Sequence, residues 1–232
     1  MLTHRQRSFI ATVEAVNGSF NFLDELLGRP AEIGGTSTSS PQKPTMAGIA
    51  HAGWAGRFFR HTVITTRGNR GSREPIYVQN PTPVVKPVEP SKRDESNYLG
   101  YVAEAVDVAP LHLYFRSVEK GYRLFVRSSV RYARALYIHK ENCVCALPSP
   151  FDNTYPTLFE LLDCDNIPIT FASLEDQAIV RLAPAGRQTP LMLRTFKGVP
   201  YTYVCTQGQS PLELRLNILE RNAAYLNDPD EV

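Results

Sequence analysis

The chain has 232 residues, of which 43% are hydrophobic, and its formal net charge is only +2. This length and apolar content suffice for one domain with a sizeable core, with or without a long arm. The 18 prolines argue against a mainly helical protein, and the small net charge excludes a polycation as a whole. No apolar run reaches the length of a membrane-spanning helix, and the N-terminal sequence predicts no signal peptide.

The four cysteines are sparse and unevenly spaced. Cys143 and Cys145 are two residues apart, so they lie on the same side of any strand. That spacing suits neither a usual zinc knuckle nor a local disulfide. We therefore expect reduced thiols in an intracellular protein.

The N-terminal region predicts a strand followed by one short helix. Residues 5–16 alternate apolar and polar side chains, as a strand with one buried face does. In the helix, Asn21 is the expected N-cap, and Asp24 places negative charge in the first turn. Gly28 and Pro30 end the helix. Because it is so short, the helix must dock against a larger unit to persist.

Two segments are predicted to be extended arms. Residues 31–46 are small, polar and interrupted by proline, and residues 80–97 are rich in proline. Between the arms, residues 57–67 predict a strand and residues 76–79 a short edge strand. We assign residues 1–97 to an N-terminal strand, helix and arm, and residues 98–232 to the main antiparallel β domain.

A basic segment lies between these arms. Its five arginines alternate with glycine and phenylalanine residues, and they are Arg57, Arg60, Arg67, Arg70 and Arg73. A basic segment that contains aromatic residues can follow a phosphate backbone. The same residues also fit an exposed loop with ordinary solubilising charge.

The most regular pattern lies between Pro110 and Ser129. Apolar and polar residues alternate over 111–116 and again over 122–127, which predicts two paired strands. Lys120-Gly121 is the expected turn, because glycine adopts a positive φ readily. The arginines that alternate out of the core, toward solvent or a neighbour, are Arg116, Arg123 and Arg127.

Seven further strands are predicted, at residues 135–140, 157–162, 167–172, 178–183, 191–196, 199–205 and 212–219. Many short strands with polar turns and little helix indicate an all-β antiparallel sandwich or barrel. A jelly roll tolerates unequal loops and long arms, and it gives the N-terminal strand a place to dock. The alternative is a β-trefoil, because the strands group loosely into three rounds of three.

No motif for catalysis or nucleotide binding is present. His112 and His139 lie on neighbouring predicted strands near the first two cysteines, where a metal site or a Cys–His nucleophilic pair is conceivable. Half-buried strand histidines explain the same pattern, and we expect no enzyme, no metal and no cofactor.

Three aromatic residues could form a carbohydrate platform, namely Trp54, Tyr201 and Tyr203. Aromatic rings stack on sugar faces, but core or interface packing is the more ordinary role of such residues.

Several stretches resemble picorna-like virus capsid proteins. Residues 22–30, FLDELLGRP, are similar to the short helix ending in Arg-Pro that follows the early strands of that family. Residues 113–126 resemble its strand pair, 135–139 the next strand, and 180–184 the late strand that ends before a proline. The chain departs from the family in having little sequence before the helix and no Asp-Asp-Phe type ending.

The resemblance implies a jelly-roll coat protein of a small non-enveloped RNA virus, which assembles into an icosahedral shell. It places the chain in the virion, and in the host cytoplasm during assembly. The implied partners are other capsid subunits and genomic RNA, with arginines 57–73 contacting one of them. The alternative function is a β-trefoil module that binds carbohydrate or protein.

Overall fold

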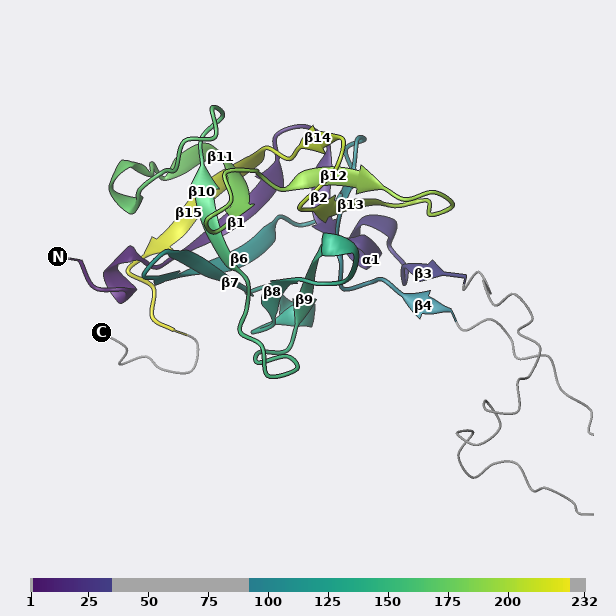
Figure 1. Cartoon of the computed structure of the whole chain (residues 1–232), viewed down its shortest axis with the longest axis horizontal. Helices are drawn as coiled ribbons and strands as arrows, with labels where there is room; N and C mark the ends of the chain where they lie inside the picture. The colour runs from purple at the N-terminus through teal and green to yellow at the C-terminus, as the bar shows by residue number, and fades with distance from the viewer. Residues whose placement is uncertain (1, 35–91, 226–232) are drawn as a thin grey trace, which may run out of the picture. The chain divides into compact units, whose positions relative to one another are not determined.

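A computed structural model describes residues 2–34 and 92–225 (Figure 1). Its α-helix is α1 (Leu23–Leu27), and short 3-10 turns lie at Arg5–Arg7, Ser129–Arg131, Lys140–Asn142 and Phe171–Ser173. The first strands are β1 (Phe9–Ala15), β2 (Ser19–Phe22), β3 (Glu32–Ile33), β4 (Arg93–Asp94), β5 (Leu99–Val102), β6 (Leu111–Val118), β7 (Gly121–Val126) and β8 (Ala135–Ile138). The later strands are β9 (Val144–Leu147), β10 (Leu158–Leu162), β11 (Gln177–Pro184), β12 (Met192–Thr195), β13 (Thr202–Cys205), β14 (Ser210–Pro211) and β15 (Leu214–Arg221).

Six strands close into a ring. In the order of the chain, β1 pairs with β6, β6 with β7, β7 with β10, β10 with β11 and β11 with β15. β15 then pairs with β1, and every pair is antiparallel. Strands β1 and β2 lie before the boundary predicted at residue 97, and they pair with strands that follow it. A sheet closed in this way is a barrel without free edges.

The ring closes where β7 meets β10. Tyr122 and Arg123 are opposite Phe159 and Leu158, and this register brings the two backbones close together. Gly121 adopts a φ of 144°, and a Cβ at this position would collide with the carbonyl oxygen of Phe159. Glycine is therefore required where the two strands begin to pair.

Between the ring strands the chain forms three antiparallel strand pairs, which we call hairpins, although α1, β3 and β4 separate the strands of the first pair along the chain. β2 and β5 lie between β1 and β6, β8 and β9 between β7 and β10, and β12 and β13 between β11 and β15. β13 also pairs with β5, so the first and third hairpins share one sheet. The all-β antiparallel class is confirmed, but the jelly roll is not. A jelly roll is built from Greek keys, whereas here ring strands pair in chain order.

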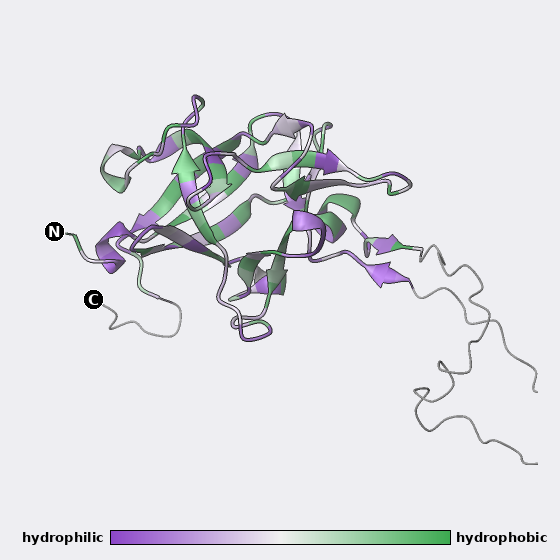
Figure 2. Ribbon diagram, viewed as in Figure 1, coloured by the Kyte–Doolittle hydropathy of each residue, from purple (hydrophilic) through white to green (hydrophobic). Residues whose placement is uncertain are grey.

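The ring strands point alternate side chains into one buried core. The inward residues are Phe9, Ala11, Val13, Leu111, Leu113, Phe115, Tyr122, Leu124, Val126, Phe159, Leu161, Val180, Leu182, Leu214 and Leu216. Residues of all three hairpins, including Phe20, Leu136 and Val204, belong to the same core. Hydrophobic residues accordingly concentrate in the strands, and several of the connecting segments are hydrophilic (Figure 2). Burial of each large side chain contributes roughly 1.5–3 kcal/mol to folding.

The short helix is confirmed, but its predicted N-cap is wrong. Phe22 is the N-cap residue and provides no side-chain hydrogen bond, whereas Asn21 belongs to β2. The Asn21 amide donates to the carbonyl of Ala109, which ties the first hairpin to the segment before β6. Gly28 ends the helix in the left-handed conformation, as predicted.

The predicted strand at 167–172 is also wrong. Phe171–Ser173 is a 3-10 turn, and Ile167 is exposed. Pro168 has no N–H to donate to a sheet, which limits this stretch to one isolated bridge with Leu162. The strands predicted at 57–67 and 76–79 lie outside the described residues.

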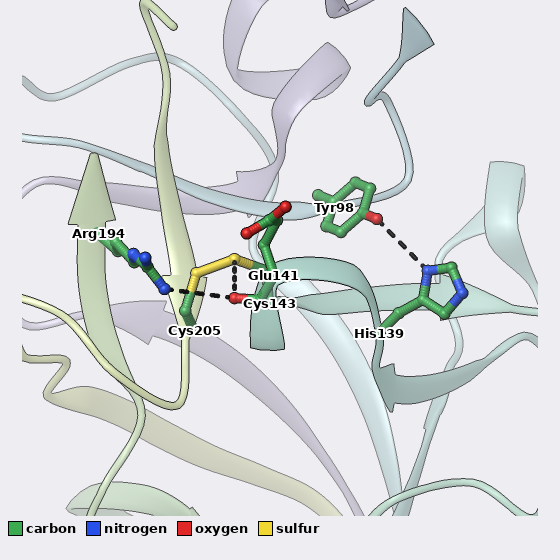
Figure 3. The surroundings of a disulfide bond; sticks show 6 residues. All are labelled: Tyr98, His139, Glu141, Cys143, Arg194 and Cys205. Carbon is green, nitrogen blue, oxygen red and sulfur yellow. Dashed lines mark hydrogen bonds between the residues drawn. A yellow bond between two sulfur atoms is a disulfide. The ribbon is translucent and has the colours of Figure 1, made fainter. Parts of the chain in front are cut away.

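A disulfide between Cys143 and Cys205 joins the second hairpin to the third (Figure 3). The expectation of reduced thiols is therefore wrong for these two residues, because the partner of Cys143 lies 62 residues away rather than two. Arg194, from β12, donates to the carbonyl of Glu141 beside the same junction. Cys145 and Cys164 are free, the first buried and the second exposed.

We expect Cys143→Ala with Cys205→Ala to lower the free energy of unfolding by about 4 kcal/mol, because the disulfide closes a long loop in the unfolded chain. Urea denaturation measures this loss, and Cys164→Ala serves as the matched control with a change under about 0.5 kcal/mol.

A thiol reagent should titrate two cysteines in the unfolded, unreduced chain. Titration of all four without reductant would contradict the disulfide.

Candidate functional site

The outer face of the β6–β7 hairpin carries two rows of side chains. On β6, Tyr114 and Arg116 point away from the barrel core, and on β7 Arg123 and Phe125 do the same. Arg116 is directly opposite Arg123, and Tyr114 is directly opposite Phe125. Arg127 follows at the end of β7, on the same face as Arg123. The hairpin therefore has two basic ends and an aromatic centre.

The pairing of Arg116 with Arg123 places like charges opposite each other, which destabilises an antiparallel pair. Each of these two guanidiniums lies over the ring of a tyrosine. The Arg116 guanidinium carbon lies 3.8 Å from the ring centre of Tyr225, and that of Arg123 lies 4.9 Å from the ring centre of Tyr155. Cation–π contacts of this kind offset part of the repulsion.

At the second basic end of the hairpin, an arginine again lies over a tyrosine ring. The Arg127 guanidinium carbon lies 5.3 Å from the ring centre of Tyr132, and its Nη1 donates to the Tyr132 hydroxyl at 3.1 Å. Tyr132 and Tyr155 are 54% and 76% exposed, which is unusual for rings of this size. We define the arginine–tyrosine surface as the set Arg116, Arg123, Arg127, Tyr132, Tyr155 and Tyr225.

Two of the three arginines of this surface, Arg123 and Arg127, have no carboxylate partner among the described residues. The Nε of Arg123 is buried and has no hydrogen-bond partner there. A buried donor without a partner costs free energy.

The centre of the hairpin is covered by the segment that follows β15. The Tyr114 hydroxyl donates to the carbonyl of Ala223 at 3.2 Å. The ring of Tyr225 packs on the rings of Phe125 and Tyr114, with centres 5.5 and 6.2 Å apart. These contacts bury Tyr114 and Phe125, the aromatic centre of the hairpin. They also restrain the hairpin backbone between its two basic ends.

The aromatic residues predicted as a carbohydrate platform do not form one. Tyr201 and Tyr203 are buried, and Tyr203 packs edge-on against Phe196 and Tyr98. Trp54 lies outside the described residues. Tyr201 lines an open groove of about 430 Å³ between α1, β5, β12 and β13, whose walls are mainly apolar.

The histidines and cysteines do not form a catalytic pair or a metal centre in the described part of the chain. Cys143 is in the disulfide, and burial raises the pKa of the Cys145 thiol to about 12, so the nucleophilic thiolate is not formed near neutral pH. His139 Nδ1 lies 3.4 Å from the Tyr98 hydroxyl (Figure 3). Among residues 2–34 and 92–225, no group of three metal-ligating side chains is present.

The arginine segment 57–73, predicted to contact RNA or a neighbouring subunit, lies outside the described residues. The sequence does place Arg116, Arg123 and Arg127 on an outward face. The tyrosines that complete the surface come from two connections and from the segment after β15, so no local pattern reveals them.

The residues on either side of Gly34–Ser91 pair with each other, and we call this pair of short strands, β3 and β4, the neck. β3 pairs with β4, and Lys92 forms a 2.8 Å ion pair with Glu32. Glu95 is only 2% exposed and pairs with Arg93. Burial raises the pKa of Glu95, and the charge of Arg93 opposes this effect. The predicted arm 80–97 is therefore wrong at its C-terminal end, which packs into the domain.

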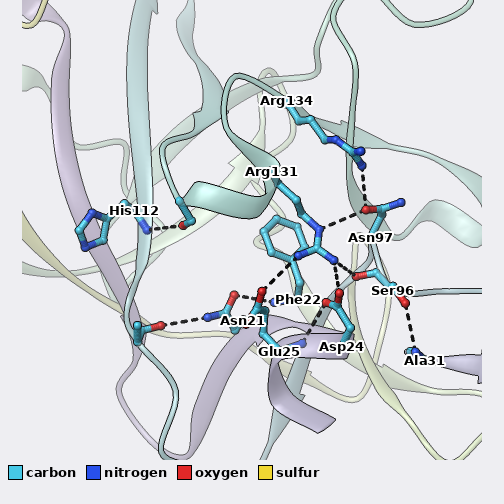
Figure 4. A network of polar contacts seen from close by, with 12 residues as sticks. Asn21, Phe22, Asp24, Glu25, Ala31, Ser96, Asn97, His112, Arg131 and Arg134 are labelled. Atoms are coloured by element: carbon cyan, nitrogen blue, oxygen red, sulfur yellow. Dashed lines mark hydrogen bonds and ion pairs between the residues drawn. The ribbon is translucent and has the colours of Figure 1, made fainter. Parts of the chain in front are cut away.

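Arg131 anchors the neck to the barrel (Figure 4). Its side chain is 4% exposed and forms a 2.5 Å ion pair with Asp24 of α1. It also donates to the Asn97 side chain and the Ser96 carbonyl, and lies over the Phe22 ring. The Ser96 hydroxyl in turn accepts the N–H of Ala31. One buried guanidinium thus joins the β7–β8 connection to both sides of the neck.

Comparisons with protein-family models, with curated proteins and with solved structures give no match. Among the described residues, no helix has the length and apolar character needed to cross a membrane.

We expect Arg131→Met to lower the free energy of unfolding by about 3 kcal/mol, because methionine keeps the apolar stem but leaves the partly buried Asp24 unpaired. Urea denaturation provides the measurement. The exposed Arg187 supplies a matched control, since Arg187→Met removes the same charge without a buried partner. Equal losses in the two variants would show that Arg131 is not the anchor.

Proposed function

We propose that this chain is a non-catalytic binding module that holds an anionic polymer on its arginine–tyrosine surface. The observation that carries the proposal is the outward placement of Arg123 and Arg127 on one face of the hairpin, because neither forms an ion pair with a carboxylate of residues 2–34 or 92–225. Two cationic side chains on one face attract an anionic polymer.

The scaffold supports a binding role. The ring of six strands with three intervening hairpins favours the β-trefoil alternative, in which the barrel is a rigid support and the outer surface carries the ligand. The buried aromatic centre fixes the spacing between the two basic ends. Such preorganisation lowers the entropy that binding costs.

The proposal predicts salt-dependent binding to polyanions. We expect both a heparin fragment and an oligouridylate to bind in fluorescence anisotropy titrations, with affinity falling steadily as salt rises. Arg116→Gln, Arg123→Gln and Arg127→Gln together should weaken both by about tenfold or more.

A matched variant controls for net charge. Arg29, Arg187 and Arg215 are exposed and lie outside the arginine–tyrosine surface. Their joint replacement by Gln removes the same charge and should weaken binding by less than about threefold. Equal weakening in the two triple variants would refute a local site, and the absence of binding to either polymer would refute the function.

A second candidate is the coat protein implied by the sequence resemblance. The observation that favours it is the anchored neck, since β3 and β4 fix both ends of the segment that contains arginines 57–73. A coat protein requires its arm to leave the β domain at a defined place, from which it reaches a neighbouring subunit or RNA.

This candidate predicts that proteases cut residues 34–91 readily in the isolated chain and slowly in an assembled particle, because contacts between subunits order and cover such a segment. Limited proteolysis with mass spectrometry of the fragments measures the two rates, and electron microscopy of the native material establishes whether a particle is present. Equal rates would contradict the assembly role.

A further inference from the structure

We infer that the anionic polymer is a single-stranded nucleic acid, whose phosphates contact the arginines and whose bases stack on Tyr132 and Tyr155. The inference rests on the proposed function, because it names the class of polymer for the same surface. It depends on the tyrosines, which a purely electrostatic site does not need.

The rings of Tyr132 and Tyr155 are exposed to solvent and do not belong to the hydrophobic core. Tyr155 and Tyr132 are more than half exposed, whereas Tyr114, in β6, is buried. Each of the two exposed rings is positioned by an arginine over it, Arg123 and Arg127 respectively. Aromatic rings placed beside cationic side chains are the arrangement by which proteins bind single strands without sequence preference.

The spacing of the two Arg–Tyr pairs suits an extended strand. Arg123 lies in β7 and Arg127 directly follows this strand. Because the two residues are four positions apart in extended chain, their Cα atoms are about 13 Å apart. The covered aromatic centre lies between them. A short run of nucleotides can therefore place a base on each ring while its phosphates pass the guanidiniums.

A duplex fits this surface less well than a single strand. Reading a duplex requires a helix or a β-ribbon that enters a groove, and stacking on a side chain requires a base that is already unstacked. The surface is the outer face of a barrel hairpin whose centre is covered by Ala223 and Tyr225. Sulfated polysaccharides supply negative charge but no flat π-face for either tyrosine.

The test compares three labelled probes in anisotropy titrations with the full chain: an oligouridylate of about 12 nucleotides, a duplex of equal length and a heparin fragment. We expect the oligouridylate to bind at least tenfold more tightly than the duplex. Tyr155→Ala and Tyr132→Ala should each weaken it about tenfold, because each removes one stacking contact.

Two further variants separate stacking from other effects. Tyr155→Phe keeps the ring and should remain within about twofold of the unsubstituted chain. Leu219→Ala removes an exposed apolar side chain elsewhere and should have no effect. Neither tyrosine replacement should change heparin affinity by more than about twofold, since heparin uses only the arginines. Unchanged thermal unfolding of the variants shows that they are folded.

The outcomes distinguish the two proposals. If both polymers bind through the three arginines but the Tyr→Ala variants keep full oligouridylate affinity, the binding module stands and the nucleic-acid inference is overturned. Heparin binding without oligouridylate binding overturns it as well. If no probe binds, the proposed function itself fails.

Discussion

Closure of the barrel between β7 and β10 is the constraint on which the remaining structure depends. Without it, β7 and β10 would leave unpaired backbone donors and acceptors, and the inward residues of six strands would not enclose a common core. Closure requires a close approach of two backbones, and Gly121 makes that approach sterically possible. The three hairpins then cover the barrel, with the Cys143–Cys205 disulfide joining two of them.

Closure also determines the character of the outer surface. Once the inward positions of β6 and β7 are occupied by the core, Arg116 and Arg123 must face outward and opposite each other. Each guanidinium lies over a tyrosine ring, which offsets part of the repulsion between like charges. A natural protein tolerates such local conflict where a surface has a function. The same closure therefore gives the core its stability and places outward the arginines on which the proposed anion binding depends.

The sequence predicts local periodicity well and long-range pairing poorly. Alternation in residues 9–15 and 111–127 correctly indicates which side chains enter the core, because each pattern reflects one buried face. It does not indicate that β7 meets β10, nor that Cys143 meets Cys205, because these contacts join residues far apart in the chain. The grouping into three rounds of three strands omits β1, β2, β5 and β9, and it includes a strand at 167–172 where the structure has a 3-10 turn.

The candidate site likewise combines residues that local periodicity predicts with residues that it does not predict. Arg116, Arg123 and Arg127 are identifiable as outward residues from alternation alone. Tyr132, Tyr155 and Tyr225 lie outside the strands, in two connections and in the segment after β15, where the sequence carries no periodic signal. Their positions depend on where the connections cross the outside of the barrel, which only the assembled fold specifies. Tyr201 and Tyr203 show the converse: as a pair they resembled a ligand platform, yet the junction of β13 with β5 buries them. Whether an aromatic residue belongs to a core or to a binding surface is decided by the strand pairing around it.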